Sequence, residues 1–204
     1  MCSKDSIIST TSKCHKVVVE LGIGDGQLLE KVVRDRKSTQ ICYVGIESDA
    51  KQIQLARDKL RVKNVYLVNE SFEKVISFFP DNYVDEFIFV LPPPEYIEKS
   101  MESQWSSFYL DIIKKLKENG SLTMVTEIIN NLLEPVTDCE FEIWKNWLMN
   151  KFTSLGFIIK EAHDDSPRYF SSHYLEQFRG DSSRIKMVTL ILLKPHSISS
   201  LAHP

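Results

Sequence analysis

The segment Lys16-Val17-Val18-Val19-Glu20-Leu21-Gly22-Ile23-Gly24-Asp25-Gly26 is an apolar run followed by three glycines at alternate positions. A continuous run of Val and Leu is typical of a strand that is buried on both faces of a parallel sheet. Glycines directly after such a strand allow a sharp turn and let the backbone approach a ligand closely. Apolar residues recur at helical spacing over residues 27–36, so the segment predicts a strand, a turn and a helix in that order.

The rest of the chain alternates short apolar runs with helical patterns. We predict further strands at residues 41–46, 64–68, 84–91, 121–126, 157–161 and 186–193, and helices at 49–60, 72–79, 105–117 and 140–155. This alternation indicates βαβ units and a parallel sheet. No clear helix separates the last two strands, so an antiparallel edge is expected there. The predicted fold class is α/β: a Rossmann-like sheet of seven strands, mostly parallel with an antiparallel last strand, and helices on both faces.

Length and composition indicate a single domain over residues 1–204, with residues 1–14 and 195–204 poorly ordered. The sequence contains neither a membrane-spanning apolar run nor the apolar stretch of a signal peptide, so the expected location is cytoplasmic. The four cysteines are scattered without zinc spacing, which predicts no metal site, and Cys42 is expected to be a small core residue. A net charge of −3 argues against coating nucleic acid by bulk attraction, but it allows a local basic face.

Acidic residues accompany the glycine-rich turn and follow the next strands. Dinucleotide-binding folds use GxGxxG to place a pyrophosphate, whereas this turn is GxGxG with an acid before it and another inside it. Carboxylates there suit the ammonium and sulfonium groups of S-adenosylmethionine better than phosphates. An acid that ends the second strand can accept both ribose hydroxyls, and polar residues after the third strand would lie near the adenine, unless they only cap a helix. The predicted cofactor-binding residues are Glu20, Gly22, Gly24, Gly26, Glu47, Asn69, Glu70 and Leu91.

Three later segments carry a more specific resemblance. Residues 85–94 end in Leu-Pro-Pro-Pro, residues 108–120 read FYLDIIKKLKENG, and residues 172–178 read SHYLEQF. Together they resemble the strand ending in Phe-Pro-Asp-Pro, the FLxLLxxxLKPGG helix and the late T-x-Y-E-x-x-F segment of the tRNA (guanine-N7-)-methyltransferase family. The resemblance spans about residues 17–193. It implies a class I methyltransferase sheet, S-adenosylmethionine as cofactor and tRNA as partner.

The chain departs from the family pattern at several positions. Pro93 stands where the family has an aspartate, and residues 95–100 replace its usual basic stretch. The late threonine is Ser172, and the late glutamate falls on Leu175 with Glu176 beside it. The amino-terminal arm is also shorter than the family usually has. These departures affect the prediction of the acceptor more than the prediction of the cofactor.

Methylation of guanine N7 requires little acid–base chemistry, because N7 already presents a lone pair. The resemblance implies that a carboxylate accepts hydrogen bonds from guanine N1–H and the 2-amino group. Glu127, in place of a family aspartate, and Glu176 are the predicted catalytic residues; the plain alternatives are a helix-start acid and a solvated loop acid. Predicted substrate-binding residues are Pro93, Arg168, Ser172, Tyr174 and Arg179.

The sequence also leaves other functions open. The proline run followed by Tyr96 resembles the Asp/Asn-Pro-Pro-aromatic loop of adenine amino-methyltransferases, although Leu91 replaces the required polar residue. The same fold serves methyltransferases of ribosomal RNA and of small molecules. A cofactor-binding partner subunit without catalysis would also fit Pro93 and the missing basic stretch. The chain could act as a homodimer or with a partner subunit.

Overall fold

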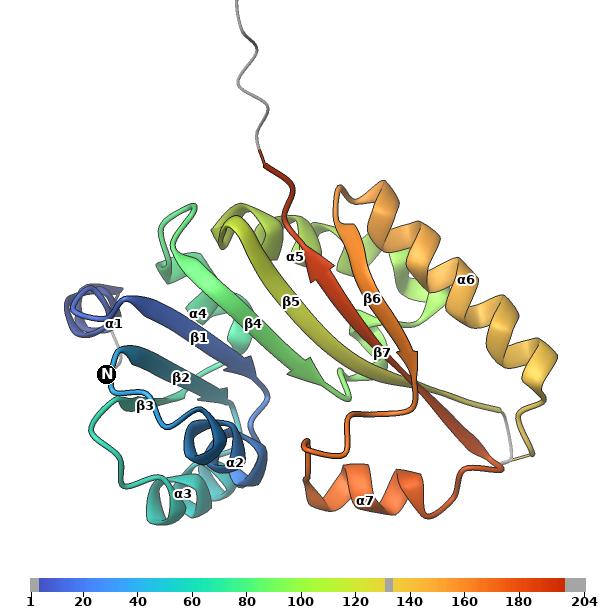
Figure 1. Ribbon diagram of the computed structural model, residues 1–204, viewed down its shortest axis with the longest axis horizontal. Helices are drawn as coiled ribbons and strands as arrows, with labels where there is room; N and C mark the ends of the chain where they lie inside the picture. The colour runs from blue at the N-terminus through green and yellow to red at the C-terminus, as the bar shows by residue number, and fades with distance from the viewer. Residues whose placement is uncertain (1–3, 131–133, 197–204) are drawn as a thin grey trace, which may run out of the picture.

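A seven-stranded sheet forms the centre of the computed structural model, which describes residues 4–130 and 134–196 (Figure 1). Its strand order is β3-β2-β1-β4-β5-β7-β6. Strands β1 to β5 all run parallel to one another. Strand β7 is antiparallel to both of its neighbours, β5 and β6. The predicted mixed sheet is therefore confirmed. The strands are β1 (Lys16–Leu21), β2 (Ile41–Glu47), β3 (Val65–Asn69), β4 (Val84–Val90), β5 (Leu116–Ile129), β6 (Ile158–Asp164) and β7 (Ile185–Leu193).

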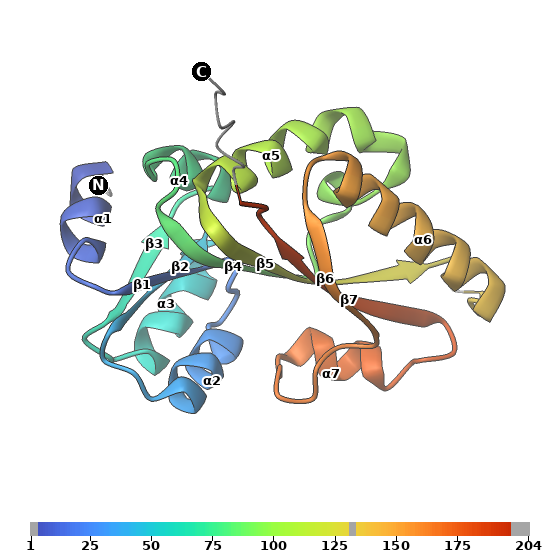
Figure 2. The same ribbon diagram turned by 45° about the horizontal axis from the view of Figure 1, so that its top comes forward.

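Helices cover both faces of the sheet (Figure 2). On one face lie α1 (Lys4–Thr11), α4 (Phe72–Phe78), α5 (Glu102–Lys115) and α6 (Asp138–Ser154), over a large apolar cluster. On the other face lie α2 (Gln27–Arg36), α3 (Ala50–Lys59) and α7 (His173–Arg179), over a smaller cluster. Two 3₁₀ turns, η1 (Pro94–Tyr96) and η2 (Lys99–Met101), connect β4 to α5. The helices on both faces agree with the prediction from sequence.

Polar side chains cap α3 and α6, two of the helices that follow strands. Asp49 Oδ1 accepts hydrogen bonds from the backbone N–H groups of Lys51 (2.7 Å) and Gln52 (3.1 Å), which caps α3. Thr137 and Glu140 form a reciprocal capping box at the start of α6. These caps satisfy the amides that a helix leaves unpaired at its first turn, and so set where each helix leaves the sheet edge.

The amino-terminal segment corrects one expectation. The sequence predicts poor order over residues 1–14, but within this range residues 4–11 form α1, in which Ile7 is only 5% exposed. The Thr11 hydroxyl lies 2.8 Å from the hydroxyl of Tyr83, and this contact joins α1 to the segment before β4. The sequence of α1 is too polar to show a helical stripe, so tertiary packing decides its structure. The terminal residues 1–3 and 197–204 lie outside the described residues.

Two other elements differ from the prediction. The short helix α7 lies between β6 and β7, where the sequence showed no clear helix. Strand β5 is longer than residues 121–126, because it pairs with β4 from Leu116 and with β7 as far as Ile129. The added carboxyl-terminal length places Glu127 within a strand rather than at a helix start.

Replacement of Ile7 by Ala tests whether α1 is packed onto the sheet. Loss of this buried side chain should lower the free energy of unfolding by about 2 kcal/mol, measured by urea denaturation. Ser9→Ala, on the exposed side of the same helix, should change it by less than about 0.5 kcal/mol. Equal effects of the two substitutions would show that α1 is not anchored through Ile7.

Candidate cofactor and acceptor site

The carboxyl ends of β1 to β5 meet at one edge of the sheet, because these strands are parallel. The turn that leaves β1 there has left-handed backbone at Gly22 (φ 69°), Gly24 (φ 53°) and Gly26 (φ 78°). The N–H groups of Gly22 and Ile23 both donate to the carbonyl oxygen of Ile46, at 2.9 and 3.0 Å. The turn is therefore fixed to the end of the neighbouring strand.

The three glycines of this turn have different surroundings. A Cβ atom added at Gly22 or Gly24 would meet no described atom within 4 Å, so these two positions border open space. A Cβ atom at Gly26 would lie 2.9 Å from the Cβ of Ala56 and from the Cδ1 of Leu60. Gly26 thus allows α2 and α3 to pack closely, and its predicted cofactor contact stays a prediction.

Glu47, at the end of β2, faces this turn. Its Oε2 accepts a hydrogen bond from Gly24 N–H at 2.9 Å, and its Oε1 accepts one from Asp49 N–H at 2.8 Å. Each carboxylate oxygen can accept a further hydrogen bond. The backbone therefore orients Glu47 without using its whole capacity, as a ribose-binding acid requires.

Asn69 and Glu70 mainly organise the neighbouring turns. The Asn69 amide donates to the carbonyl oxygens of Glu47 (2.9 Å) and Ser48 (3.0 Å). The Glu70 carboxylate accepts hydrogen bonds from Ser71 N–H (3.2 Å) and from the Lys74 ammonium (2.5 Å). Asn69 thus positions the Glu47 turn, and Glu70 interacts with the first turn of α4; their predicted contacts with the adenine stay predictions.

Glu20 is a buried acid at the centre of the site. Its side chain is almost fully enclosed, and its Oε2 has no hydrogen-bond partner within the described ranges. Burial raises the pKa of the Glu20 carboxyl well above its usual value. A buried polar atom without a partner is costly, and it suggests a site whose ligand supplies the missing donor.

Glu127 is a half-buried acid on the carboxyl-terminal half of β5, opposite Met187 of β7. The nearby side chains of Phe170 and Leu175 belong, with Met187, to one apolar cluster. Glu127 Oε2 is enclosed and unpaired among the described residues. Burial raises the pKa of this carboxyl from 4.5 to about 7. Such perturbed carboxyls are typical of functional sites.

The sheet register places the acids on one face. Glu20 pairs with Gly45 of β2 and, across β4, lies level with Thr123 of β5. Paired residues share a face and alternate residues return to it, so Glu47 and Glu127 point to the side of Glu20. Two strand spacings and four residues of rise separate Glu20 from Glu127 by roughly 16 Å. This span suits a nucleoside cofactor followed by an acceptor, rather than two acids that act on one atom.

The segment after β4 borders the same edge. Leu91 has left-handed backbone (φ 52°), and its N–H donates to the carbonyl oxygen of Val125 at 2.8 Å. A non-glycine residue in this conformation is strained, and such strain gathers at functional sites. Pro93 is half-buried and offers only its carbonyl, which accepts from Tyr96 N–H. The Tyr96 ring packs against Phe72 and Phe108 on the opposite face of the sheet, so it is not placed to stack an adenine.

The segment around α7 lies over the face that carries the acids. Ser172 caps α7 by accepting from Leu175 N–H at 3.3 Å. Tyr174 is 64% exposed and Arg168 is exposed. The Glu176 carboxylate is 56% exposed and pairs with Arg179 at 2.7 Å. Glu176 is thus part of a surface ion pair, whereas Glu127 is half-buried with one enclosed oxygen.

Arg179 has a structural environment that differs from the expected substrate contact. Its Nε donates to the Ser166 hydroxyl at 2.9 Å, and its Nη2 donates to the carbonyl oxygens of Pro167 and Phe170, both at 2.8 Å. With Nη1 bound to Glu176, the guanidinium fastens the loop before α7. This arrangement could not be inferred from spacing alone, because the contacts are to backbone carbonyls.

Two further observations concern metals and membranes. Within residues 4–130 and 134–196, no group of three or more His, Cys, Asp or Glu side chains could hold a metal ion. None of the helices in these ranges is long and apolar enough to cross a membrane.

The sequence of residues 14–154, more than two thirds of the chain, matches a family model described as "Putative methyltransferase". This model represents the tRNA (guanine-N7-)-methyltransferase-like family, a class I S-adenosylmethionine-dependent group. The chain belongs to this family. The resemblance inferred from sequence is therefore confirmed, and the protein is an S-adenosylmethionine-dependent methyltransferase. No curated protein matches it significantly.

Solved structures share the fold of this methyltransferase at low identity. The 16S rRNA methyltransferase KamB superposes with a TM-score of 0.73 at 14% identity, over 96% of this chain and 95% of that one. A 16S rRNA (adenine(1408)-N(1))-methyltransferase from Catenulisporales acidiphilia gives 0.69 at 14% identity, over 98% and 95%. The cyclase SpnF gives 0.62 at 19% identity, over 95% and 81%. At these identities the likeness shows the fold alone.

S-adenosylmethionine, the cofactor of this methyltransferase, fits the residues at the carboxyl edge. Gly22 and Gly24 leave open space beside the backbone, Glu47 keeps free acceptor capacity, and Glu20 has an unpaired buried oxygen. Carboxylates are the chemical match for a ligand that carries ammonium and sulfonium charges and ribose hydroxyls.

The glycines of the turn should separate cofactor binding from folding. Gly24→Ala places a methyl group in the open space and should weaken S-adenosylhomocysteine binding roughly tenfold or more, measured by calorimetry. Its cost in unfolding free energy should be only about 1 kcal/mol. Gly26→Ala should cost about 3 kcal/mol, because strain and contact with α3 add. The reverse ranking would contradict the assigned roles.

Glu127 should make stability depend on pH. The pKa of Glu127 is higher in the folded protein than in the unfolded chain. Its contribution to the free energy of unfolding is therefore fully present below about pH 4.5 and is lost as the pH rises through about 7. Glu127→Gln stays neutral throughout. The stability of this variant relative to the unsubstituted protein should therefore increase by up to about 3 kcal/mol between about pH 5 and pH 8. Parallel stability curves from urea denaturation would show that Glu127 is not buried as described.

Proposed function

We propose that this methyltransferase transfers the methyl group of S-adenosylmethionine to N7 of a guanine in tRNA. The observation that carries the proposal is Glu127, a half-buried acid with an enclosed, unpaired oxygen on the face of the sheet that carries Glu20 and Glu47. Membership of the family supports it. The activity requires an acceptor base near the sulfonium and does not require a strong general base.

The chemistry follows from the lone pair on guanine N7, which attacks the methyl carbon directly while the sulfonium leaves as a neutral thioether. The protein then mainly aligns the two reactants, which can supply several kcal/mol of the barrier reduction. The two oxygens of ionised Glu127 match the N1–H and 2-amino donors on the far edge of the base. These donors would favour the ionised carboxylate and lower its raised pKa on binding.

The other residues then take supporting roles. Glu20, Gly22, Gly24 and Glu47 hold the cofactor, and Asn69 keeps the Glu47 turn in place. Arg168 and Tyr174, both exposed beside the site, contact the RNA backbone and bases. A cytoplasmic location stays a prediction from the sequence.

A second candidate acceptor is a base in ribosomal RNA. It is favoured by Pro93, which stands where the tRNA (guanine-N7-)-methyltransferase pattern has an aspartate. KamB and the adenine(1408)-N(1) enzyme, which share this fold, are described as methyltransferases of 16S rRNA.

Methyl transfer from tritium-labelled S-adenosylmethionine tests both candidates. Purified protein is incubated with bulk tRNA or with ribosomal RNA, and the products are digested to nucleosides. Label in 7-methylguanosine from tRNA is the expected result. Label only in another nucleoside, or only in ribosomal RNA, would overturn the proposal. Cofactor binding by calorimetry without transfer to either RNA would instead identify a partner subunit without catalysis.

Substitution of each candidate acid identifies the one that holds the base. Glu127→Gln should reduce kcat/KM for tRNA about a hundredfold, because an amide places a donor against the donors of guanine. Glu176→Gln should reduce it less than about tenfold, since that side chain forms an exposed ion pair. Calorimetry should show unchanged cofactor affinity for both variants. A larger loss for Glu176→Gln would reverse the assignment.

A further inference from the structure

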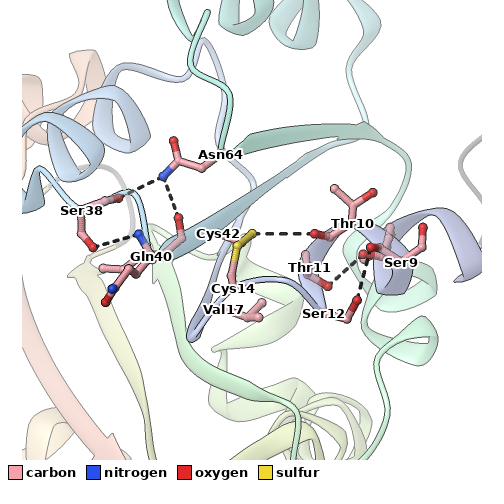
Figure 3. Close-up of a disulfide and its surroundings, with 12 residues drawn as sticks. Ser9, Thr10, Thr11, Ser12, Cys14, Val17, Ser38, Gln40, Cys42 and Asn64 are labelled. Atoms are coloured by element: carbon pink, nitrogen blue, oxygen red, sulfur yellow. Dashed lines mark hydrogen bonds between the residues drawn. A yellow bond between two sulfur atoms is a disulfide. The ribbon is translucent and has the colours of Figure 1, made fainter.

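A disulfide joins Cys14, just before β1, to Cys42 in β2 (Figure 3). Their Cα atoms lie 5.7 Å apart, which is the usual spacing for such a bond. The sequence showed only scattered cysteines and placed Cys42 in the core. Cys42 is indeed fully buried, but it is bonded to Cys14, which is half-buried. Among the described residues, Cys139 is the free and exposed cysteine.

The bond closes a ring of chain that contains the complete glycine-rich turn. The two cysteines are 28 positions apart, and between them lie β1, the turn at residues 22–26, and α2. Strand β1, inside the ring, pairs with β2 from Lys16 with Ile41 to Leu21 with Ile46, and β2 continues beyond the ring after Cys42. The disulfide therefore ties the two strands together at one end, and the hydrogen bonds from the turn to Ile46 tie them at the other.

The local structure can survive opening of the bond. Cys42 Sγ lies 4.0 Å from the carbonyl oxygen of Thr10, so a reduced thiol would have an acceptor where it stands. Other contacts hold the same segment independently of the bond: His15 N–H donates to the Gln40 carbonyl oxygen at 2.9 Å, and the Thr11 hydroxyl lies 2.8 Å from that of Tyr83. Opening therefore loosens the β1–β2 unit without removing its remaining contacts.

We propose that the Cys14–Cys42 disulfide is a redox-responsive clasp on the cofactor-binding unit. When closed, it suppresses local opening of β1, the turn and β2, and so favours cofactor binding. When reduced, the unit opens more often, and each opening releases the geometry that Gly24 and Glu47 need.

The redox step is thiol–disulfide exchange with a dithiol. A thiolate of the dithiol attacks the more accessible Cys14 Sγ and forms a mixed disulfide, while Cys42 leaves with the bonding electron pair and takes up a proton. The second thiol of the dithiol then displaces Cys14 as a thiol. The protein gains two electrons and two protons, and the dithiol becomes a cyclic disulfide. A small-molecule disulfide such as oxidised glutathione reverses the exchange.

Peptide mapping first establishes the bond in solution. Protein equilibrated with oxidised glutathione is alkylated and digested with trypsin without reduction. Peptides of residues 14–16 and 38–51 should appear as one linked species that separates on treatment with dithiothreitol. Two separate alkylated peptides under the oxidising condition would overturn the proposal.

Calorimetry with S-adenosylhomocysteine and thermal unfolding then measure the consequence. Dithiothreitol should weaken binding by the unsubstituted protein about fivefold or more. It should also lower Tm on the order of 10 °C. Cys14→Ser should show the weaker binding and the lower Tm with and without dithiothreitol, whereas Cys139→Ser should respond as the unsubstituted protein does.

Hydrogen exchange distinguishes a local effect on the glycine-rich turn from a general effect on stability. Hydrogen exchange at the amides of Gly22 and Ile23 should accelerate on reduction, while amides of β5 and β7 should change less. Equal affinity of the oxidised and reduced protein, with the linked peptides verified, would overturn the clasp. A fall in Tm without a change in affinity or in turn exchange would show a staple of general stability instead.

Discussion

The Glu47 carboxylate accepts hydrogen bonds from the N–H groups of Gly24 and Asp49, and so joins the turn after β1 to the turn after β2. The bond to Gly24 is possible because that residue adopts φ 53°. Side chains at the carboxyl edge are arranged around this joint. Asn69 fixes the backbone of Glu47 from the next strand, and the amide of Gly22 fixes the turn to Ile46. A cofactor entering here meets acceptors whose orientation is set before it binds.

Two carboxyl groups near this edge carry a free-energy cost, because each has an enclosed oxygen. Glu20 and Glu127 each keep an enclosed oxygen without a partner in the described part of the chain, and burial raises the pKa of both. A protein selected only for stability would replace them with apolar groups, because an unpaired buried acceptor costs about 1–3 kcal/mol. Ligands that carry a cation or N–H donors would remove this cost. The cost of these unpaired oxygens is thus coupled to the chemistry that we propose for the site.

The sequence predicted the sheet well because buried strands and amphipathic helices carry a clear periodic signal. It also located Glu20, Gly22, Gly24 and Glu47 at one edge, since parallel strands bring consecutive turns together. It did not reveal α1, whose polar sequence depends on Ile7 for its packing. The contacts that Gly26, Asn69 and Arg179 make within the protein could not be predicted for a common reason: they involve distant backbone or helices, which residue type and spacing do not encode. The disulfide was missed because two cysteines 28 positions apart show no motif.

A crystal structure with S-adenosylhomocysteine would test the arrangement most directly. We expect the ribose hydroxyls on Glu47, the amino-acid portion beside Gly22 and Gly24 near Glu20, and the sulfur on the side of Glu127. Density for the cofactor at another edge of the sheet, such as the 390 Å³ polar cavity between Arg36 and Lys117 at the amino ends of β1 and β4, would contradict the account.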